Sequence, residues 1–183
     1  PGLFLSVEQS RRSLLRQMER MGMSEAVVKG KLKLADMREL RKEMAEHPGN
    51  WRELIMEYVR KEQETMGFQL FALDSLESFK ALTEHCFTRQ DLKDLFDWFK
   101  SQGITVLVTS ENVSDDYDEG SQGEAYLSDG IIELLMKEIM DSRVQRWVRC
   151  VKMRGCNADN RYYSIFHDGR QFNLALPLAN QPF

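Results

Sequence analysis

The sequence is poor in the residues that mark several common protein classes. Its 183 residues include three cysteines, Cys86, Cys150 and Cys156, whose number is odd and whose spacing matches no zinc motif. We therefore expect reduced thiols and a cytoplasmic location rather than a disulfide framework. The three histidines are scattered and indicate no histidine-based metal site. No apolar run reaches membrane-spanning length and no signal peptide is recognisable, so we expect no membrane association.

A net positive charge and a phosphate-binding loop are also missing. The formal net charge is −4 and the pI is about 5.5, which argues against nucleic acid as a partner. No GxxxxGKS/T motif occurs in the sequence. The Gly30–Lys31 pair lacks the preceding glycine and stands before a predicted strand rather than a helix. The sequence therefore contains no recognisable loop of its own for holding a triphosphate.

What is present is an alternation of apolar and amphipathic segments. It predicts strands over residues 2–7, 31–36, 68–74 and 104–111, and helices over residues 10–22, 24–30, 37–47, 50–67 and 88–103. Asn50, with Glu53 at the capping-box position, and Thr88 are the expected caps of the last two helices. The strands at 68–74 and 104–111 have no polar face. Strands of that kind indicate a parallel sheet that is covered on both sides.

The pattern changes after residue 111. An acidic segment over residues 112–129 predicts a loop, followed by strands over 130–140, 143–155 and 161–177. Turns are expected at 140–143 and at 167–169, where Gly169 permits a left-handed backbone. We therefore predict one α/β domain over residues 1–183, with a mostly parallel twisted sheet flanked by helices and antiparallel strands at its C-terminal end.

Polar residues end three of the predicted parallel strands. Glu8 follows the first, Asp74 ends the third, and Thr109 to Glu111 end the fourth. Ligands of open α/β sheets bind at this edge, where a carboxylate can hold a magnesium-bound water or polarise an attacking one. The alternatives are that Asp74, with Ser75 beside it, caps the next helix, and that Glu8 is favoured by a helix dipole.

Several cations gather on the predicted strand over residues 143–155. If no bulge intervenes, period-two geometry places Arg146, Lys152 and Arg154 on one face. Such a face can recognise phosphate. The alternative is a solvated face of an edge strand, where cations prevent aggregation.

Six segments, in order, resemble the KaiC-like branch of the RecA-type ATPases. They are GLFLSVEQSRRSLLRQMERMGM, VVKGKLKLAD, LFALDSLESF, GITVLVTSE, YLSDGIIEL and VKMRG, and the resemblance extends in order over nearly the whole chain. The third resembles the Walker B strand, and the last resembles the Lys-Leu/Met-Arg-Gly signature of that family. The resemblance implies a RecA-like fold, a homo-oligomer that can be a hexameric ring, and ATP with Mg²⁺ between subunits.

The resemblance also implies roles for individual residues. Glu8 matches the catalytic base, and Asp74 matches the Walker B carboxylate near Mg²⁺. Ser75 and Met153 fall within the nucleotide-contacting motifs. Lys152 and Arg154 match residues that reach the phosphates of the nucleotide held by the neighbouring subunit. Asp168 matches a position near the neighbour's base or ribose.

The sequence departs from the family pattern in three places. The second glutamate position is Gln9, which cannot act as a base, and Cys156 to Ala158 replace a polar Thr-x-His. The family's first strand, P-loop and first helix are expected before Pro1. Three readings stay open: part of an active, signalling or regulatory ATPase; a RecA-like interaction or regulatory module that does not hydrolyse ATP; and a recombinase-like DNA-binding protein, which the acidic balance disfavours.

Overall fold

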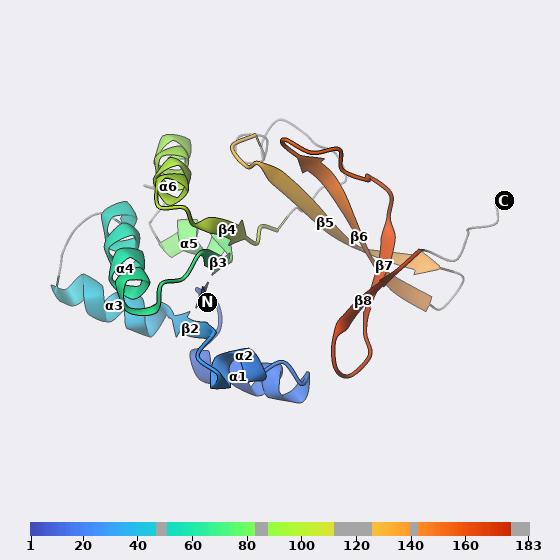
Figure 1. Ribbon diagram of the computed structural model, residues 1–183, viewed down its shortest axis with the longest axis horizontal. Helices are drawn as coiled ribbons and strands as arrows, with labels where there is room; N and C mark the ends of the chain where they lie inside the picture. The colour runs from blue at the N-terminus through green and yellow to red at the C-terminus, as the bar shows by residue number, and fades with distance from the viewer. Residues whose placement is uncertain (47–50, 83–87, 112–125, 140–142, 177–183) are drawn as a thin grey trace. The chain divides into compact units, whose positions relative to one another are not determined.

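The computed structural model describes residues 1–46, 51–82, 88–111, 126–139 and 143–176 (Figure 1). It forms two compact units, Pro1–Ser121 and Gln122–Phe183, and each is described by itself. Within the described residues, no helix is long and apolar enough to cross a membrane.

A parallel four-stranded sheet forms the centre of the first unit, as the sequence predicts. Its strands β1 (Gly2–Ser6), β2 (Leu32–Asp36), β3 (Leu70–Asp74) and β4 (Thr105–Val108) lie in the order β2-β1-β3-β4. β1 therefore pairs with both β2 and β3, although 63 residues lie between Ser6 and Leu70 in the sequence. This order places the carboxyl ends of β1 and β3 side by side.

Six helices are described in this unit, and all five predicted helices are among them. They are α1 (Arg11–Arg20), α2 (Glu25–Val28), α3 (Met37–Glu46), α4 (Trp51–Met66), α5 (Leu76–Leu82) and α6 (Arg89–Ser101). α1, α2 and α3 pack beside β2, α6 packs beside β4, and α4 contacts both α3 and α6 (Figure 1). The sixth helix, α5, was not predicted, and a single residue, Ser75, separates it from β3.

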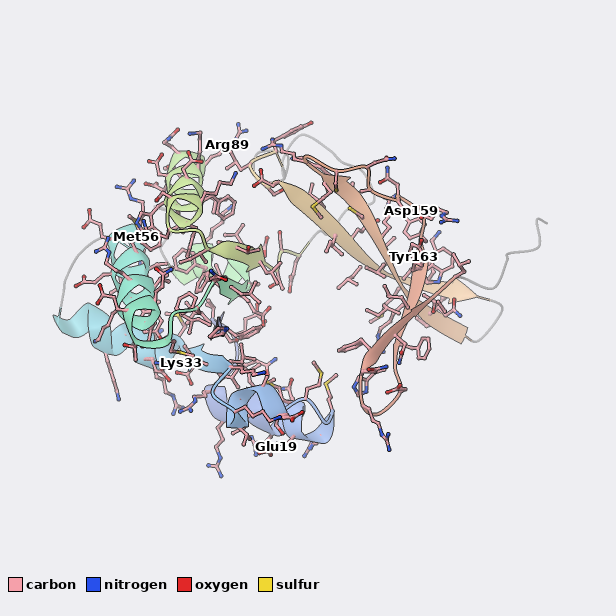
Figure 2. The ribbon with its side chains drawn as sticks, viewed as in Figure 1. Glu19, Lys33, Met56, Arg89, Asp159 and Tyr163 are labelled. Atoms are coloured by element: carbon pink, nitrogen blue, oxygen red, sulfur yellow. The ribbon has the colours of Figure 1, made fainter. Side chains whose placement is uncertain are left out.

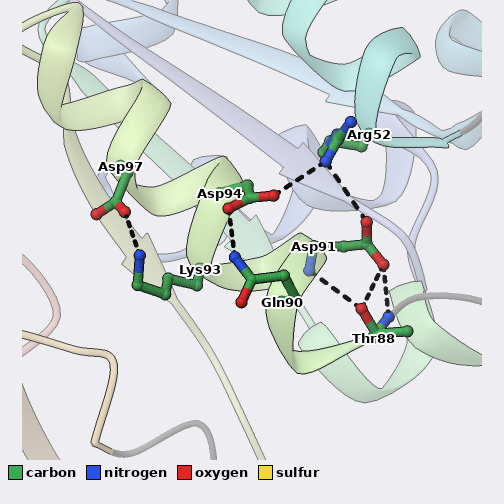
Figure 3. Close-up of polar contacts among 7 residues, drawn as sticks. All are labelled: Arg52, Thr88, Gln90, Asp91, Lys93, Asp94 and Asp97. Carbon is green, nitrogen blue, oxygen red and sulfur yellow. Dashed lines mark hydrogen bonds and ion pairs between the residues drawn. The ribbon is translucent and has the colours of Figure 1, made fainter.

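Helix α6 begins as predicted. The Thr88 hydroxyl accepts a hydrogen bond from the backbone N–H of Asp91 at 3.2 Å, and the Asp91 carboxylate accepts from the backbone N–H of Thr88 at 2.9 Å. This reciprocal pair is a capping box. Arg52 of α4 reaches Asp91 and Asp94 at 3.6 and 3.2 Å and so links the two helices (Figure 3). The predicted cap at Asn50 lies outside the described residues.

The core of the first unit lies between the sheet and these helices. Leu3 and Leu5 of β1 and Phe71 of β3 are buried, and the Phe71 ring stacks on Phe99 of α6 with ring centroids 5.0 Å apart. At the other edge, Lys33 of β2, labelled in Figure 2, forms an ion pair with Glu62 of α4 at 2.6 Å. β4 differs from the prediction of cover on both faces, because its Leu107 is 52% exposed. Thr105 and Leu107, which share a face of β4, are both exposed, so the described residues do not cover that face of the strand.

The second unit is an antiparallel sheet, also as predicted. β5 (Gly130–Ile139), β6 (Arg143–Met153), β7 (Tyr163–His167) and β8 (Phe172–Ala175) lie in sequence order. The predicted last strand is therefore two strands, separated by the predicted turn in which Gly169 has φ 95°. The predicted turn at residues 140–143 and most of the predicted acidic loop lie outside the described residues.

The two faces of this sheet differ in burial. Trp147 of β6 is buried, with its ring 5.3 Å from that of Tyr162 and the Lys137 ammonium 5.0 Å above it. The opposite face exposes Ile132, Leu134 and Met136. The covered face is therefore the one that carries Trp147.

A cluster of polar side chains lies at the start of β7. There the Asp159 carboxylate accepts hydrogen bonds from Arg161 and, at 2.8 Å, from the Tyr163 hydroxyl (Figure 2).

Candidate functional site

The carboxyl ends of β1, β3 and β4 meet at one edge of the parallel sheet, as the sequence predicts. Ser6 at the end of β1 pairs with Asp74 at the end of β3, and Leu73 pairs with Val108 at the end of β4. Backbone hydrogen bonds continue past the strands, because Val7 N–H donates to the Asp74 carbonyl at 2.7 Å. The loops that carry Glu8, Asp74 and Thr109 therefore leave the sheet next to one another.

Glu8 reaches across from the β1–α1 loop to the start of α5. Its Oε1 atom accepts a hydrogen bond from the Ser75 hydroxyl and another from the Ser78 hydroxyl, each at 2.7 Å. The Ser78 hydroxyl, and then that of Ser75, hold the pKa of Glu8 below its usual value. Glu8 is exposed and is therefore an ionised, accessible carboxylate at neutral pH. Its hydrogen bonds among the described residues are with Ser75 and Ser78 of the β3–α5 connection.

Asp74 is bound to the neighbouring strand end and does not cap α5. Its Oδ1 atom accepts from the Thr109 hydroxyl at 2.7 Å. The capping position is taken by Ser75, whose hydroxyl oxygen accepts from Ser78 N–H at 3.4 Å. Ser75 therefore caps α5, and the Asp74 carboxylate lies toward the end of β4.

A third carboxylate at this edge was missed by the sequence analysis. Glu77, in the first turn of α5, accepts from the Ser110 hydroxyl at 2.5 Å and from the Glu111 backbone N–H at 3.1 Å. The sequence signal was its position three residues after Asp74, opposite the polar end of the fourth strand. Glu8, Asp74 and Glu77 thus each accept hydroxyl groups from a neighbouring segment, which ties the three loops together.

The cationic strand differs from the period-two prediction. Ile132 pairs with Cys150 whereas Ile131 pairs with Lys152, so Val151 is an extra residue in a β-bulge. Paired residues share a face, so the bulge moves Lys152 to the face of Trp147, opposite Arg146. Because a bulge intervenes, the condition under which Arg146 and Lys152 would share a face is not met. β6 pairs with β5 along its length but with β7 only at Trp147 and Val148 among the described residues, so the part of β6 that carries Lys152 has β5 alone as its neighbour.

Lys152 and Arg154 are held by the segment that leads into β5. The Lys152 ammonium donates to the Ser128 carbonyl at 2.7 Å, and the Arg154 guanidinium donates to the Tyr126 carbonyl at 2.9 Å and to the Asp129 carboxylate at 3.3 Å. Burial, and then the positive charge of Arg154, lower the pKa of Lys152. The backbone N–H of Arg154 also donates to the Asp129 carbonyl at 2.7 Å. The segments YLSDGIIEL and VKMRG therefore meet at one end of the β5–β6 pair.

Met153 and Asp168 have local structural contacts. A Cβ atom on Gly130 would lie 2.7 Å from the Met153 sulfur, so the thioether occupies the space beside this glycine. Asp168 accepts hydrogen bonds from the backbone N–H groups of Arg170 and Gln171 at 2.8 and 2.9 Å, which lower its pKa. Its second oxygen accepts from the Asn173 side chain at 2.8 Å. Both oxygens of Asp168 thus stabilise the β7–β8 turn.

Comparison with known proteins identifies the family. The family model described as "ATPase: KaiC" matches residues 1–168. This chain belongs to the KaiC family. Over 98% of its length it is 26% identical to the circadian clock protein KaiC2 of Synechocystis, and it spans 32% of that protein's length. A solved KaiC-like protein from the archaeon Pyrococcus horikoshii has the same fold, with a TM-score of 0.77, 20% identity, and coverage of 96% of this chain and 75% of the other.

Membership of the KaiC family implies the use of a nucleotide and Mg²⁺. The described residues could supply only part of the coordination shell of that metal. No group of three His, Cys, Asp or Glu residues among them could hold a metal ion on its own. Mg²⁺ keeps several waters and is usually bound by one or two carboxylates together with substrate phosphates. Asp74, with the Thr109 hydroxyl beside it, supplies oxygen atoms of the kind that Mg²⁺ prefers. The edge therefore suits a metal held mainly by phosphate and water.

An enclosed space in the first unit is unrelated to this edge. It measures about 10 Å³ and is lined by apolar side chains from β3, β4 and the helices, including Phe71, Phe79 and Phe99. A space of that size holds at most one water and no nucleotide. The accessible polar groups of the first unit's sheet edge, and the cations of the second unit, are thus the candidate functional residues.

Proposed function

We propose that this chain supplies part of an ATP-hydrolysing site, with Glu8 as the base and Asp74 next to Mg²⁺. The observation that carries the proposal is the meeting of these two carboxylates at the carboxyl edge of a parallel sheet, each held by hydroxyl groups of the neighbouring loop. In open α/β folds this edge is the usual ligand site. Membership of the KaiC family supports ATP as the ligand.

Glu8 has the properties that a water-activating residue needs. It is exposed and ionised at neutral pH, so it can accept a proton from a water at its surface. Gln9, next to it, is neutral, and its side chain accepts from the Gln17 amide at 2.6 Å. We therefore assign the role of general base to Glu8 and not to Gln9.

Asp74 is assigned to the metal side of the site. Mg²⁺, when bound, neutralises charge that develops on the phosphate oxygens. The Thr109 hydroxyl fixes the orientation of the Asp74 carboxylate through Oδ1. Ser75, buried between Glu8 and the start of α5, connects the two carboxylates and keeps their loops in register.

Lys152 and Arg154 are assigned to the phosphates of a nucleotide on a neighbouring subunit. A lysine ammonium has three donors and an arginine guanidinium has five. The contacts with Tyr126 and Asp129 use two donors of Arg154, and Lys152 donates to the Ser128 carbonyl. Arg154 can therefore be oriented by its own unit and still bind phosphate, with the Lys152 charge beside it. Met153 would shape this region beside Gly130, whereas Asp168 lies in the β7–β8 turn toward the other end of β6 and is assigned to the base or ribose of the neighbour's nucleotide.

This assignment requires an assembly of several copies. A head-to-tail interface brings residues of one subunit to the nucleotide of the next, and such interfaces form a ring when the rotation between subunits closes. We propose a homo-oligomeric ring, with a hexamer as the expected size, and a regulatory or signalling role in the cytoplasm. Cys150 and Cys156 are free thiols, which suits that compartment.

Subunit mixing tests both assignments in one experiment. In the full-length protein, Glu8→Gln and the double variant Lys152→Ala with Arg154→Ala should each lose ATP turnover. If the cations act in trans, random mixing of the two variants in equal amounts restores about a quarter of the head-to-tail interfaces, and turnover reappears in that proportion. Exchange of Lys137 and Arg161 for alanine is the matched control and should not change turnover.

Two results would contradict the proposal. Full turnover in the Lys152 and Arg154 double variant would remove these residues from the site, and mixing without recovery would remove their action in trans. A wild-type protein that binds partners but shows no nucleotide turnover would favour the alternative of a non-hydrolysing interaction module. Calorimetry with Mg-ATP separates loss of turnover from loss of binding.

A further inference from the structure

Glu8 receives two hydroxyl groups on a single oxygen atom. Ser75 directly follows β3, and Ser78 lies in the first turn of α5, so the two donors are fixed by the start of one helix. Both bonds end on Oε1 and measure 2.7 Å. Ser78 has no role in the function proposed above.

We propose that Ser78, together with Ser75, is a positioning residue that fixes the Glu8 carboxylate with its Oε2 atom directed at the attacking water. The proposal rests on the proposed function, because it assumes that Glu8 is the base. It adds a residue of α5 to the machinery that prepares the reaction.

The two carboxylate oxygens of Glu8 differ in the hydrogen bonds that they accept. An ionised carboxylate has about four lone-pair sites, two on each oxygen. Two short bonds from Ser75 and Ser78 fill those of Oε1. Among the described residues, Oε2 accepts no hydrogen bond, so it is the atom with capacity to accept the proton of a water. An exposed glutamate on a loop otherwise samples many rotamers, and a base is effective only within hydrogen-bond reach of the proton that it removes.

Ser78 can be changed with less structural damage than Ser75. The Ser75 side chain is 4% exposed, and its oxygen also accepts from Ser78 N–H, so Ser75→Ala would disturb the start of α5. Ser78 is half-buried and lies within α5, where alanine is the best helix former. Ser78→Ala therefore removes one bond to Glu8 and keeps the helix, and Ser78→Thr keeps the hydroxyl.

The charged groups near Glu8 include two carboxylates and an arginine. On the packed elements these are Asp74, which accepts from Thr109, and Glu77, which accepts from Ser110. Arg11 begins α1, and its backbone N–H donates to Asp36 at 2.8 Å. Glu8 has no ion-pair partner among the described residues, so its hydroxyl bonds are the interactions that set its behaviour.

The direct test follows the carboxyl carbon of Glu8 by NMR during a pH titration of this polypeptide, without nucleotide. Removal of the Ser78 hydroxyl should raise the pKa of Glu8 toward the ordinary glutamate value, because that hydroxyl stabilises the ionised form. Ser78→Thr should restore the wild-type titration. Ser101→Ala is the matched control, because its hydroxyl donates to the Trp98 carbonyl in α6 and does not touch the edge.

Turnover of the full-length protein supplies the second readout. Loss of one hydrogen bond to a charged group should lower kcat about tenfold in Ser78→Ala, with KM for ATP within about twofold of wild type. Ser78→Thr should recover kcat. An unchanged Glu8 pKa in Ser78→Ala, or unchanged kcat, would overturn the positioning role. Full turnover in Glu8→Gln would instead overturn the proposed function and the positioning role with it.

Discussion

Asp36 offers the sharpest test of how the sheet edge is built. It is the last residue of β2 and is 8% exposed. Its Oδ2 atom accepts from the Arg11 backbone N–H at 2.8 Å, and its Oδ1 atom accepts from the Arg38 backbone N–H at 2.9 Å. One carboxylate thus serves the first turns of α1 and α3, and it anchors the helix that follows the Glu8 loop.

Asp36→Ala should remove both bonds at once. Hydrogen bonds to charged groups contribute about 1.5–3 kcal/mol each, and water can replace part of what is lost at a helix start, so we expect a loss of about 2–4 kcal/mol in the free energy of unfolding. Asp36→Asn is the matched control for size. Its amide keeps one acceptor but turns N–H groups toward a backbone donor, so it should lose a large part of the same free energy.

The loss should depend on pH in a defined direction. Burial raises the pKa of Asp36, but the N–H groups of Arg11 and Arg38 lower it more, and the folded-state pKa lies below the usual value. A depressed carboxyl pKa contributes stability above the unfolded-state pKa, near 4, and that contribution disappears as the pH falls through the folded-state pKa. The difference between wild type and Asp36→Ala should therefore be full at pH 7 and shrink below about pH 4.

Urea denaturation followed by circular dichroism measures this difference, with the midpoint and the slope compared at each pH. A loss below about 0.5 kcal/mol at pH 7 would be that of an ordinary surface substitution and would refute the reasoning. A loss of equal size at pH 7 and at pH 3 would show that the charge of Asp36 is not what stabilises the two helix starts.

Two further predictions concern α6. Thr88→Ala removes the hydroxyl of the capping box that Thr88 forms with Asp91, and it should lower the free energy of unfolding by about 1 kcal/mol. Thr88→Ser keeps the hydroxyl and should keep the wild-type stability. Phe99→Ala removes a ring that is 1% exposed and stacked on Phe71, and it should lower the free energy of unfolding by about 3–5 kcal/mol. Phe166→Ala, at a site 47% exposed, is its control and should fall within about 0.5 kcal/mol of wild type, all by urea denaturation.

The alternation of strands and helices, and the edge at which polar residues gather, could be predicted from the sequence. Apolar runs without a polar face set the parallel sheet, and Glu8 and Asp74 end two of them, so their meeting follows from parallel pairing. The partners of these carboxylates could not be predicted. Glu8 bonds to Ser78, 70 residues away, because β1 and β3 are neighbours in the sheet, and no local pattern records that neighbourhood.

The face of Lys152 could not be predicted for a different reason. Alternation assigns faces only while the register is constant, and one extra residue at Val151 reverses every assignment after it. The contact of the Tyr126–Asp129 segment with Lys152 and Arg154 follows from the β5–β6 pairing. Two motifs that are separate in the sequence therefore form one structural group.

The measurement that tests the central claim most directly is single-turnover hydrolysis of Mg-ATP by the full-length protein and its Glu8→Gln variant, beside calorimetric binding of the nucleotide. A general base contributes about 10²- to 10⁴-fold, so the account predicts a loss of at least about 100-fold in hydrolysis with binding retained. Hydrolysis by Glu8→Gln at the wild-type rate would contradict it.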